Sequence, residues 1–318
     1  MSLELNGISL TYQRRGRLPL PAVAGVDLSL SRGRIAGLVG ESGCGKSSLG
    51  RVAVGLIAPT AGTVLFNGKP LSVIGSGARP RLELGVQMVF QNPFESLNPR
   101  RKVGDQIADG MRKRGDSSTS SRHARVIGLL DRLGLPRSAV DAYPHQFSGG
   151  QRQRIAIARA LAVSPEYLIL DEPLASLDAS AQAQLANLLQ DLAVAEGLGM
   201  LLISHDLSIV HHIADTVFVM YLGLVVEAAP TRELWRAPLH PYTQALIESV
   251  PNPDGKGVLP PSLTGEVGDP ANPPSGCRFR TRCSHAFDRC ALESPKLVQI
   301  EADRLVSCWL HTAAPNSD

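Results

Sequence analysis

Apolar and polar residues alternate over the first thirty positions, and this period of two predicts strands with one buried face. The alternating apolar positions are Leu3, Leu5, Ile8, Leu10, Tyr12, Val26, Leu28 and Leu30. Residues 35–39 form a continuous apolar run that ends in glycines, which indicates a buried strand entering a loop. Residues 62–66 predict a further strand, closed by the turn pair Asn67-Gly68.

The pattern turns helical from about residue 98 to residue 161 and then alternates between strand and helix. The helical spacing is carried by Val126, Leu129, Leu130, Leu133 and Leu135. Beyond them, residues 167–170 and 200–204 predict strands on either side of a helix at residues 179–195. Such alternation predicts an α/β layer with a parallel sheet.

A change of composition after Val250 predicts a boundary in the chain. Residues 251–276 hold seven prolines among glycines and small polar residues, which is typical of an extended linker or loop. Four of the five cysteines lie beyond this segment, so we expect a small C-terminal module there.

Composition and charge exclude several classes of protein. The 318 residues allow one large domain or two unequal ones, and 43% apolar with 19% charged residues is typical of a globular protein. A net charge of +3 is too small to argue for nucleic acid or anionic lipid. The short run Arg112-Lys113-Arg114 is interpreted as a solvated surface.

No segment is typical of a membrane span or a signal peptide. The most apolar run, residues 217–226, is far shorter than the roughly 20 residues that a bilayer span requires. Residues 1–4 show no basic region followed by an apolar one. A cytosolic chain is expected, which would serve a membrane only through partners that span it.

A phosphate-binding loop is predicted directly after the strand at residues 35–39. The sequence there is Gly40-Glu41-Ser42-Gly43-Cys44-Gly45-Lys46-Ser47-Ser48, which fits the pattern G-x-x-x-x-G-K-[ST]. Glycines let backbone N–H groups turn inward around phosphate oxygens, and the dipole of the following helix favours the same charge. Lys46 would reach the β- and γ-phosphates of ATP, and the Ser47 hydroxyl would hold Mg²⁺. The alternative is a chance glycine-rich turn, against which the strand before it and the helix after it argue.

Two carboxylates end the apolar strand that begins at residue 167. Because the strand is buried, its carboxyl end would deliver both acids to the edge of the sheet where the phosphate loop lies. Asp171 would bind Mg²⁺, directly or through water, and Glu172 would polarise the attacking water. The alternative is an exposed acidic turn, which the phosphate loop makes less favoured.

A second anion site is predicted at Ser148-Gly149-Gly150-Gln151, which opens the helix through Leu161. Taken alone, this segment could simply cap a helix. Its serine and N-terminal amides can also bind an anion, and that site would close over ATP held by a partner subunit. Set between the phosphate loop and Asp171-Glu172, it resembles the signature sequence of the ABC ATPase family.

The resemblance implies roles for four further residues. Gln91 is placed like the glutamine that touches Mg²⁺ or the water, Asp178 like the D-loop aspartate, and His205 like the histidine that contacts the γ-phosphate. Tyr12 is placed like the aromatic residue that stacks on adenine, with a core strand residue as the alternative. One departure is Ala175, where the family usually has a serine.

The C-terminal third resembles the ATPases of dipeptide/oligopeptide importers, and most closely the second of their two ATPase subunits. The similar segments are residues 240–246, 263–266 and 272–277 and the cysteines Cys277, Cys283, Cys290 and Cys308. The resemblance implies a heterodimer with a second ABC ATPase, two transmembrane permease subunits and an extracytoplasmic substrate-binding protein. The chain would lie peripherally on the cytoplasmic face of the plasma membrane. Relatives carry nickel or glutathione, so those solutes stay open beside peptides.

The expected fold is a P-loop NTPase core with a parallel sheet, an N-terminal antiparallel β subdomain, a helical subdomain and the Cys-rich module. The ATPase domain would cover residues 1–235, with the helical subdomain at about residues 92–160, and the extension would cover residues 236–318. The contact surface for the permease is expected in residues 92–147, including residues 96–100.

The cysteines suggest metal rather than disulfides in a reducing compartment. The four C-terminal cysteines are separated by five, six and seventeen residues, without the short Cys-x₂₋₄-Cys knuckle that is common in zinc sites. Thiolates also hold iron–sulfur centres, and the resemblance implies a [4Fe–4S] cluster on these four residues. Zinc, and free or disulfide-bonded thiols, are the alternatives. Cys44 would be a small residue whose N–H binds phosphate, with a redox switch as the alternative.

Two other functions are weighed against transport. A soluble ABC ATPase acting on nucleic acid usually carries two cores or aromatic and basic faces, whereas this chain has one core and 4% aromatic residues. A catalytically inactive scaffold would lack the acid at the end of the strand or the later histidine, and both Glu172 and His205 are present here. The sequence therefore favours an ATP-hydrolysing importer subunit.

Overall fold

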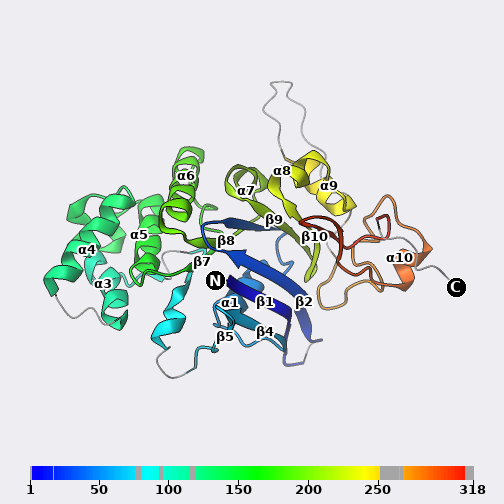
Figure 1. The fold of residues 1–318 in the computed structure, drawn as a ribbon, viewed down its shortest axis with the longest axis horizontal. Coiled ribbons are helices and arrows are strands. Elements are labelled where there is room, and N and C mark those ends of the chain that lie inside the picture. Colours follow the sequence, from blue (N-terminus) through cyan, green and yellow to red (C-terminus); the bar gives the residue numbers. More distant parts are fainter. Residues whose placement is uncertain are drawn as a thin grey trace.

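Two β-sheets form the framework of the computed structural model, which describes residues 2–16, 18–75, 80–92, 96–114, 119–250, 265 and 268–311 (Figure 1). The smaller sheet has the order β2-β1-β4-β5 and is antiparallel. Its strands are β1 (Ser2–Tyr12), β2 (Leu20–Ser31), β4 (Ala61–Phe66) and β5 (Lys69–Pro70). Asn67 and Gly68 turn the β4–β5 hairpin with φ angles of 52° and 75°, as the sequence pair predicts.

The larger sheet has eight strands in the order β11-β12-β10-β9-β3-β8-β7-β6. Its strands are β3 (Ile35–Val39), β6 (Val86–Val89), β7 (Tyr167–Asp171), β8 (Gly199–Ser204), β9 (Thr216–Tyr221), β10 (Leu224–Pro230), β11 (Val298–Glu301) and β12 (Arg304–Val306). The expected parallel sheet is confirmed for the five neighbouring strands from β6 to β9. The remaining strands β10, β12 and β11 pair antiparallel with their neighbours, so the sheet as a whole is mixed.

Helices cover the larger sheet and also lie beyond it at both ends of the molecule (Figure 1). They are α1 (Lys46–Ala53), α3 (Val103–Arg114), α4 (Thr119–Arg132), α5 (Gly149–Leu161), α6 (Ala179–Glu196), α7 (Leu207–Ile213), α8 (Thr231–Arg236), α9 (Pro241–Glu248) and α10 (Asp288–Leu292). Short 3₁₀ turns occur at Arg81–Gly85, Arg137–Val140 and Pro144–Gln146. The helices α3, α4 and α5 form the helical region at one end of the long axis, and α10 lies at the other.

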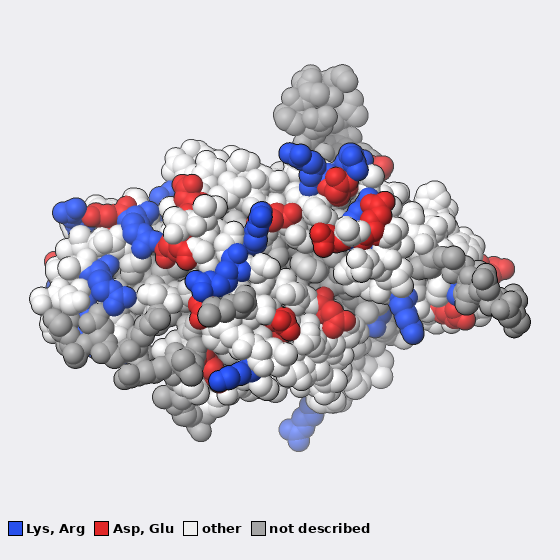
Figure 2. Space-filling model, in the orientation of Figure 1, with Lys and Arg blue, Asp and Glu red and all other residues white. Residues whose placement is uncertain are grey.

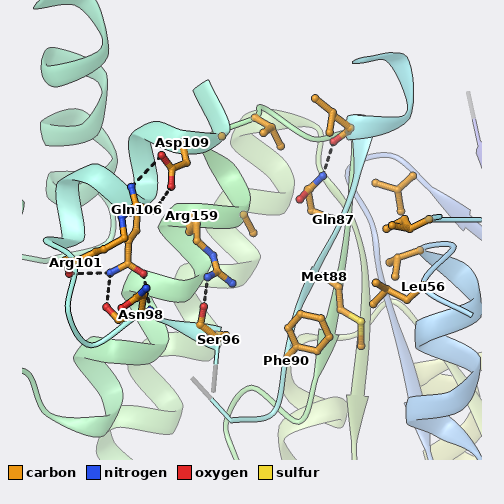
Figure 3. Close-up of a pocket in the computed structure, with 17 residues that line it drawn as sticks. Leu56, Gln87, Met88, Phe90, Ser96, Asn98, Arg101, Gln106, Asp109 and Arg159 are labelled. Atoms are coloured by element: carbon orange, nitrogen blue, oxygen red, sulfur yellow. Dashed lines mark hydrogen bonds and ion pairs between the residues drawn. The ribbon is translucent and has the colours of Figure 1, made fainter. Parts of the chain in front are cut away.

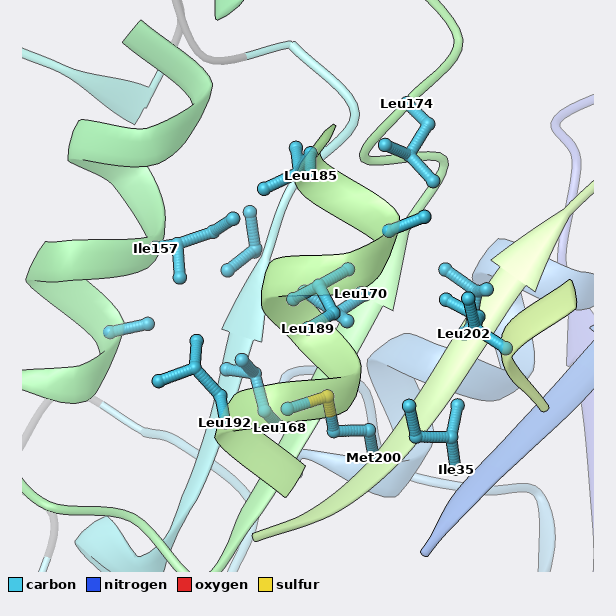
Figure 4. Close-up of a cluster of buried hydrophobic side chains, with 14 of the residues drawn as sticks. Ile35, Ile157, Leu168, Leu170, Leu174, Leu185, Leu189, Leu192, Met200 and Leu202 are labelled. Atoms are coloured by element: carbon cyan, nitrogen blue, oxygen red, sulfur yellow. The ribbon is translucent and has the colours of Figure 1, made fainter. Parts of the chain in front are cut away.

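The parallel strands are buried on both faces, and successive side chains enter two different cores. In β7, Leu168 and Leu170 pack beneath α6 against Leu185 and Leu189 (Figure 4). Their neighbours Tyr167 and Ile169 point into the second core, between the two sheets and α1. This alternation explains why a period of two is absent from the sequence of these strands, since both faces are apolar.

The apolar run at residues 217–226 forms a hairpin of β9 and β10, turned at Leu222 and Gly223 with φ angles of 42° and 86°. Within the described ranges no helix is long and apolar enough to cross a membrane. Most of the proline-rich segment 251–276 and the segment 263–266, apart from Gly265, lie outside the described residues.

The C-terminal residues do not stand apart from the core. Strand β12 pairs with β10 through Val306 opposite Glu227, so the extension continues the main sheet. Phe279 packs against Tyr221 and Tyr242 with ring centroids 5.2 and 5.3 Å away. Residues on both sides of the division expected between 235 and 236, such as Leu234 and Phe279, share one hydrophobic cluster, and the division itself stays a prediction.

Candidate active site

The phosphate loop connects β3 to α1, where the sequence pattern predicts it. Two of its glycines are required by close contact with neighbouring backbone. A Cβ on Gly40 would lie 2.1 Å from the Met220 carbonyl oxygen, and one on Gly45 would lie 2.1 Å from that of Ala22. Gly43, with φ +78°, has open space on its Cβ side. The phosphate loop therefore packs closely against β9 and β2 at Gly40 and Gly45, and it has open space beside Gly43.

Lys46 is buried at the start of α1, with 5% of its surface exposed. Its Nζ donates to the carbonyl oxygens of Gly40 at 2.7 Å and Glu41 at 3.0 Å. The ammonium group is thus held over the loop by the backbone itself. A phosphate bound in the loop would find this charge already oriented, so little reorganisation is needed.

Ser47 and Asp171 join the phosphate loop to the carboxyl end of β7. The Ser47 hydroxyl donates to Asp171 Oδ1 at 2.8 Å, across the end of the intervening strand β8. Hydroxyl and carboxylate oxygens are the ligand types that Mg²⁺ prefers, so these two residues fit a magnesium site. Burial raises the pKa of the Asp171 carboxyl above its ordinary value, and the Ser47 hydrogen bond partly opposes the rise.

Glu172 follows Asp171 with a backbone that is rare for a residue with a side chain. Its φ is 50°, and its N–H donates to the Ile203 carbonyl at 3.0 Å, which fixes this conformation. The carboxylate Oε2 lies 2.6 Å from Nδ1 of His205, the residue after β8. Left-handed non-glycine residues cluster at functional sites, and here the turn directs an 11% exposed carboxylate to a 60% exposed imidazole.

Gln91 follows β6 after one intervening residue, and Tyr12 is the last residue of β1. Gln91 is exposed and follows β6, whose Val89 pairs with Leu170 of β7, so it leaves the sheet at the edge where Asp171 lies. The Tyr12 hydroxyl is 3.1 Å from Ser48 Oγ in the first turn of α1. The Tyr12 ring also packs half-buried against the second core, which is the alternative that the sequence left open.

Ser148 and Gln151 form a capping box at the start of α5. Gln151 N–H donates to Ser148 Oγ at 3.3 Å, and Ser148 N–H donates to Gln151 Oε1 at 3.0 Å. Gly149 and Gly150 lie between them, and both capping residues are exposed. Asp178 caps α6 through Ala181 N–H at 2.9 Å and is also exposed. These residues thus have capping roles, and their surfaces are open to a partner.

Cys44 is 3% exposed inside the loop. Burial raises the pKa of its thiol, so the thiol stays protonated and weakly nucleophilic near neutral pH. Its carbonyl accepts from Gly223 N–H at 2.8 Å. Burial of the thiol therefore argues against the redox switch, and phosphate binding by the Cys44 N–H stays a prediction.

The four C-terminal cysteines surround one small pocket, together with His240 and His285. Cys277 N–H donates to the Cys290 carbonyl at 2.8 Å, and none of the four cysteines forms a disulfide. Burial raises the pKa of Cys308 to about 11, and it also raises those of Cys277 and Cys283. Among the described residues, no group of three or more His, Cys, Asp or Glu side chains is arranged to hold a metal ion. The cysteines converge as predicted, without a ligating geometry.

Sequence reasoning missed three residues of the C-terminal extension, of which two contact the phosphate loop and one contacts the neighbouring turn between β9 and β10. Arg282 and Tyr242 bind Glu41, and Arg278 binds the Leu222 carbonyl. Glu41 occupies a free position of the loop motif, and its partners lie some 200 residues away. No local pattern could have signalled these contacts.

Together, a phosphate loop, two acids at the end of the parallel strand β7 and a glycine-rich helix start define an ATP-hydrolysing cassette. The model of the ABC transporter family matches residues 23–175, and that of the oligopeptide/dipeptide transporter C-terminal region matches residues 226–290. The chain belongs to the ABC transporter family, in the group that carries this C-terminal region, and it is an ATPase.

Relatives agree with this membership over nearly the full length. The oligopeptide transport ATP-binding protein AppF of Bacillus subtilis is 46% identical over 320 residues, covering 98% of this chain and 97% of that one. A protein of Brucella ovis named as a peptide import ATP-binding protein is 42% identical over 307 residues, covering 96% of each. The dimeric ATP-binding cassette MJ0796, solved in a post-hydrolysis state with ADP and Pi, is similar with a TM-score of 0.66 and 25% identity. It covers 72% of this chain and 99% of its own.

We expect Asp171→Asn to stabilise the nucleotide-free protein near neutral pH while it weakens Mg²⁺-dependent ATP binding. The folded state holds the Asp171 proton more tightly than the unfolded chain does. The stabilisation that protonated Asp171 gives the folded state is therefore complete below the ordinary aspartate pKa of about 4. It is lost as the pH rises through the higher pKa of the folded state. Asparagine has no such loss, so denaturant midpoints of variant and wild type should diverge with rising pH. The exposed Asp178→Asn is the matched control, and parallel curves for Asp171→Asn would contradict the prediction.

Proposed function

We propose that the chain powers the uptake of di- or oligopeptides, or of related nickel- or glutathione-type solutes, through partner membrane subunits. The observation that carries this proposal is the joining of two parts. The hydrolytic edge formed by Ser47, Asp171, Glu172 and His205 is continuous with a C-terminal region that matches oligopeptide/dipeptide transporters. The names of the relatives from Bacillus subtilis and Brucella ovis support the same assignment.

In the proposed mechanism, Lys46 and the amides of residues 42–48 bind the phosphates, and Tyr12 stacks on adenine. Mg²⁺ held by Ser47, Asp171 and Gln91 would neutralise charge on the β- and γ-phosphates. Glu172 accepts a proton from water as the water oxygen attacks the γ-phosphorus and the bond to ADP breaks. His205 holds the Glu172 carboxylate at 2.6 Å and reaches the γ-phosphate from its exposed position.

The second anion site argues for two ATPase subunits. Ser148 and Gln151 lie exposed at the start of α5, with the half-buried Gly149 and Gly150 between them, and Asp178 lies exposed at the start of α6. We assign them to ATP bound by the partner subunit, with a second, different ABC ATPase completing a head-to-tail heterodimer. The dimeric state of the similar cassette MJ0796 supports a pair of this kind.

A groove between the sheet and the helical region is the proposed docking site for the permease (Figure 3). It has a volume of about 530 Å³. One wall is apolar, with Leu56, Ile74, Met88 and Phe90, and the other is polar. The polar wall is held by internal bonds: Arg101 pairs with Asp109 at 2.6 Å, Gln106 bonds Asn98, and Arg159 bonds the Ser96 carbonyl.

The groove suits a short amphipathic segment of a membrane subunit. Most of its polar wall comes from the range 92–147 expected from the sequence, with Arg159 added from α5, and the apolar wall comes from residues between 56 and 90. Gln91 lies close in sequence to Phe90, so occupation of the groove would act on the ATP site. On the face shown in Figure 2, basic and acidic side chains are interspersed without a broad region of one sign. This distribution favours the permease over nucleic acid as the partner.

The proposed location is the cytoplasmic face of the plasma membrane, where the chain would lie peripherally on the permease. An extracytoplasmic substrate-binding protein would deliver the solute. We further propose that Cys277, Cys283, Cys290 and Cys308 bind a [4Fe–4S] cluster, with zinc as the alternative. Their convergence on one pocket supports a shared ligand, and thiolates suit both metals. A metal cluster would stabilise the segment that carries these cysteines, which has little hydrophobic core of its own.

We expect Glu172→Gln to lower the rate of ATP hydrolysis by about 10²–10⁴-fold, because the amide cannot accept the proton of the attacking water. ATP binding should persist, and an ATP-bound dimer with the second ATPase should accumulate and be visible by size-exclusion chromatography. Glu166→Gln is the matched control, since Glu166 precedes the opposite end of β7. Unchanged hydrolysis in Glu172→Gln would exclude Glu172 from this role.

We expect Ile74→Asp to abolish co-purification with the membrane subunits, since it puts a charge into the apolar wall of the groove, where Ile74 is 41% exposed. ATP binding by the isolated chain should be unaffected. Val194→Asp, on a 79% exposed position of α6, is the control and should retain the permease. Retention by both variants would place the contact elsewhere.

We expect protein purified without oxygen to contain about four iron and four sulfide per chain and to absorb visible light. Cys277→Ser and Cys290→Ser should lose both, whereas Cys44→Ser should keep them because Cys44 lies in the phosphate loop. Stoichiometric zinc would support the alternative metal. The absence of any metal in anaerobic protein would count against a metal centre.

A further inference from the structure

We infer that the C-terminal extension completes the ATP site of its own chain, with Arg282 and Arg278 as positioning residues for the phosphate loop. The inference rests on the proposed assignment of residues 40–48 as that loop. It adds a role that neither family match assigns, since the loop and the C-terminal region fall in separate matches. Three sets of contacts carry it.

The first contact is an ion pair between Arg282 and Glu41. Arg282 Nη1 and Nη2 donate to the two Glu41 carboxylate oxygens at 2.7 and 3.0 Å, a bidentate geometry. The Arg282 side chain is 3% exposed and that of Glu41 is 19% exposed. The guanidinium carbon lies 5.9 Å from the Tyr221 ring centroid and 6.0 Å from that of Phe279. The pair is therefore a packed, shielded interaction rather than a surface ion pair.

The second contact fixes the backbone of Glu41. Its N–H donates to the hydroxyl of the fully buried Tyr242 at 2.9 Å. Its carbonyl accepts from Lys46 Nζ at 3.0 Å. Amide, carbonyl and carboxylate of Glu41 are thus all held, and two of the three partners come from the extension. The orientation of Glu41 in turn sets where the Lys46 ammonium lies.

The third contact acts on the other side of the loop. Arg278 donates to the Leu222 carbonyl, at the turn between β9 and β10. The next residue, Gly223, donates its N–H to the Cys44 carbonyl at 2.8 Å. Arg278 follows Cys277, and Arg282 precedes Cys283. The fold of the cysteine segment therefore decides where both guanidinium groups lie.

Charge gives these contacts a consequence for ATP. The loop must bind a polyanion, yet Glu41 places a carboxylate within it. Arg282 neutralises that carboxylate and holds it in a mostly buried position. Without Arg282, the negative charge would be uncompensated beside the phosphates, and an ionic repulsion of this kind weakens with salt.

The test is a double-mutant cycle on the full-length chain, with MgATP binding measured by calorimetry in a Glu172→Gln background. We expect Arg282→Met to raise the Kd for MgATP on the order of tenfold, since charge-assisted hydrogen bonds to the loop are lost. The defect should shrink at high salt. Adding Glu41→Gln should restore much of the affinity, because it removes the uncompensated charge.

The control is Arg280→Met, two residues away, whose guanidinium bonds only Ser275 in the described contacts. It should bind MgATP like the parent. Arg282→Lys keeps the charge but not the bidentate geometry, so it should fall between the parent and Arg282→Met. This variant keeps the test decisive if Arg282→Met does not fold, which circular dichroism would reveal.

Coupling is reciprocal, so MgATP should also protect the extension. Amide hydrogen exchange in residues 277–290 should slow when MgATP binds the parent and should respond less in the Arg282 variants. A double variant no better than Arg282→Met, a salt-independent defect, or equal affinity in the Arg282 and Arg280 variants would each overturn the inference. Failure of the parent itself to bind MgATP would instead overturn the proposed function.

Discussion

The site depends on one constraint: parallel strands that are buried on both faces can accommodate charged side chains only at their ends. Leu168, Ile169 and Leu170 of β7 occupy the two cores, so Asp171 is the first position of that strand where a carboxylate can meet another polar group. The same is true of β3 before the phosphate loop and of β8 before His205. Because these strands run parallel and in register, their ends meet along one edge, and the Ser47–Asp171 hydrogen bond links two of them.

Placing polar groups at this edge has a cost in stability that function can explain. Burial penalises the ionised Asp171, and the left-handed backbone of Glu172 is unfavourable for a residue with a side chain. The Ile203 carbonyl and the Ser47 hydroxyl offset part of both effects. MgATP would complete the compensation, since a divalent cation favours ionised Asp171. We therefore expect the ionised Asp171 and the left-handed backbone of Glu172 to lower the stability of the nucleotide-free protein.

Much of the core and the site could be predicted from sequence, because the signals are local. The phosphate loop needs glycines at fixed positions, and Asp171-Glu172 follows its strand directly, so spacing alone placed Lys46, Ser47 and Asp171 on one edge. Contacts that depend on the tertiary fold gave no such signal. Nothing near Arg304 indicates that β12 pairs with β10, and Glu41 is separated from Arg282 by 241 residues. The capping box of Ser148 shows its local role, and the anion-binding role that we propose for it would use the same exposed position.

The extension shows how a phosphate loop can be adapted by a distant part of the chain. An acidic residue in a phosphate loop is unfavourable for anion binding unless its charge is balanced and its direction fixed. Arg282 does both, because a bidentate guanidinium neutralises the carboxylate and orients it, which a lysine would do less completely. Since Arg278 and Arg282 lie between Cys277 and Cys283, any change that rearranges this cysteine segment would move the two groups that hold the loop. The cysteine segment is therefore placed to influence ATP binding through the ordinary packing of one continuous core, without contacting the nucleotide.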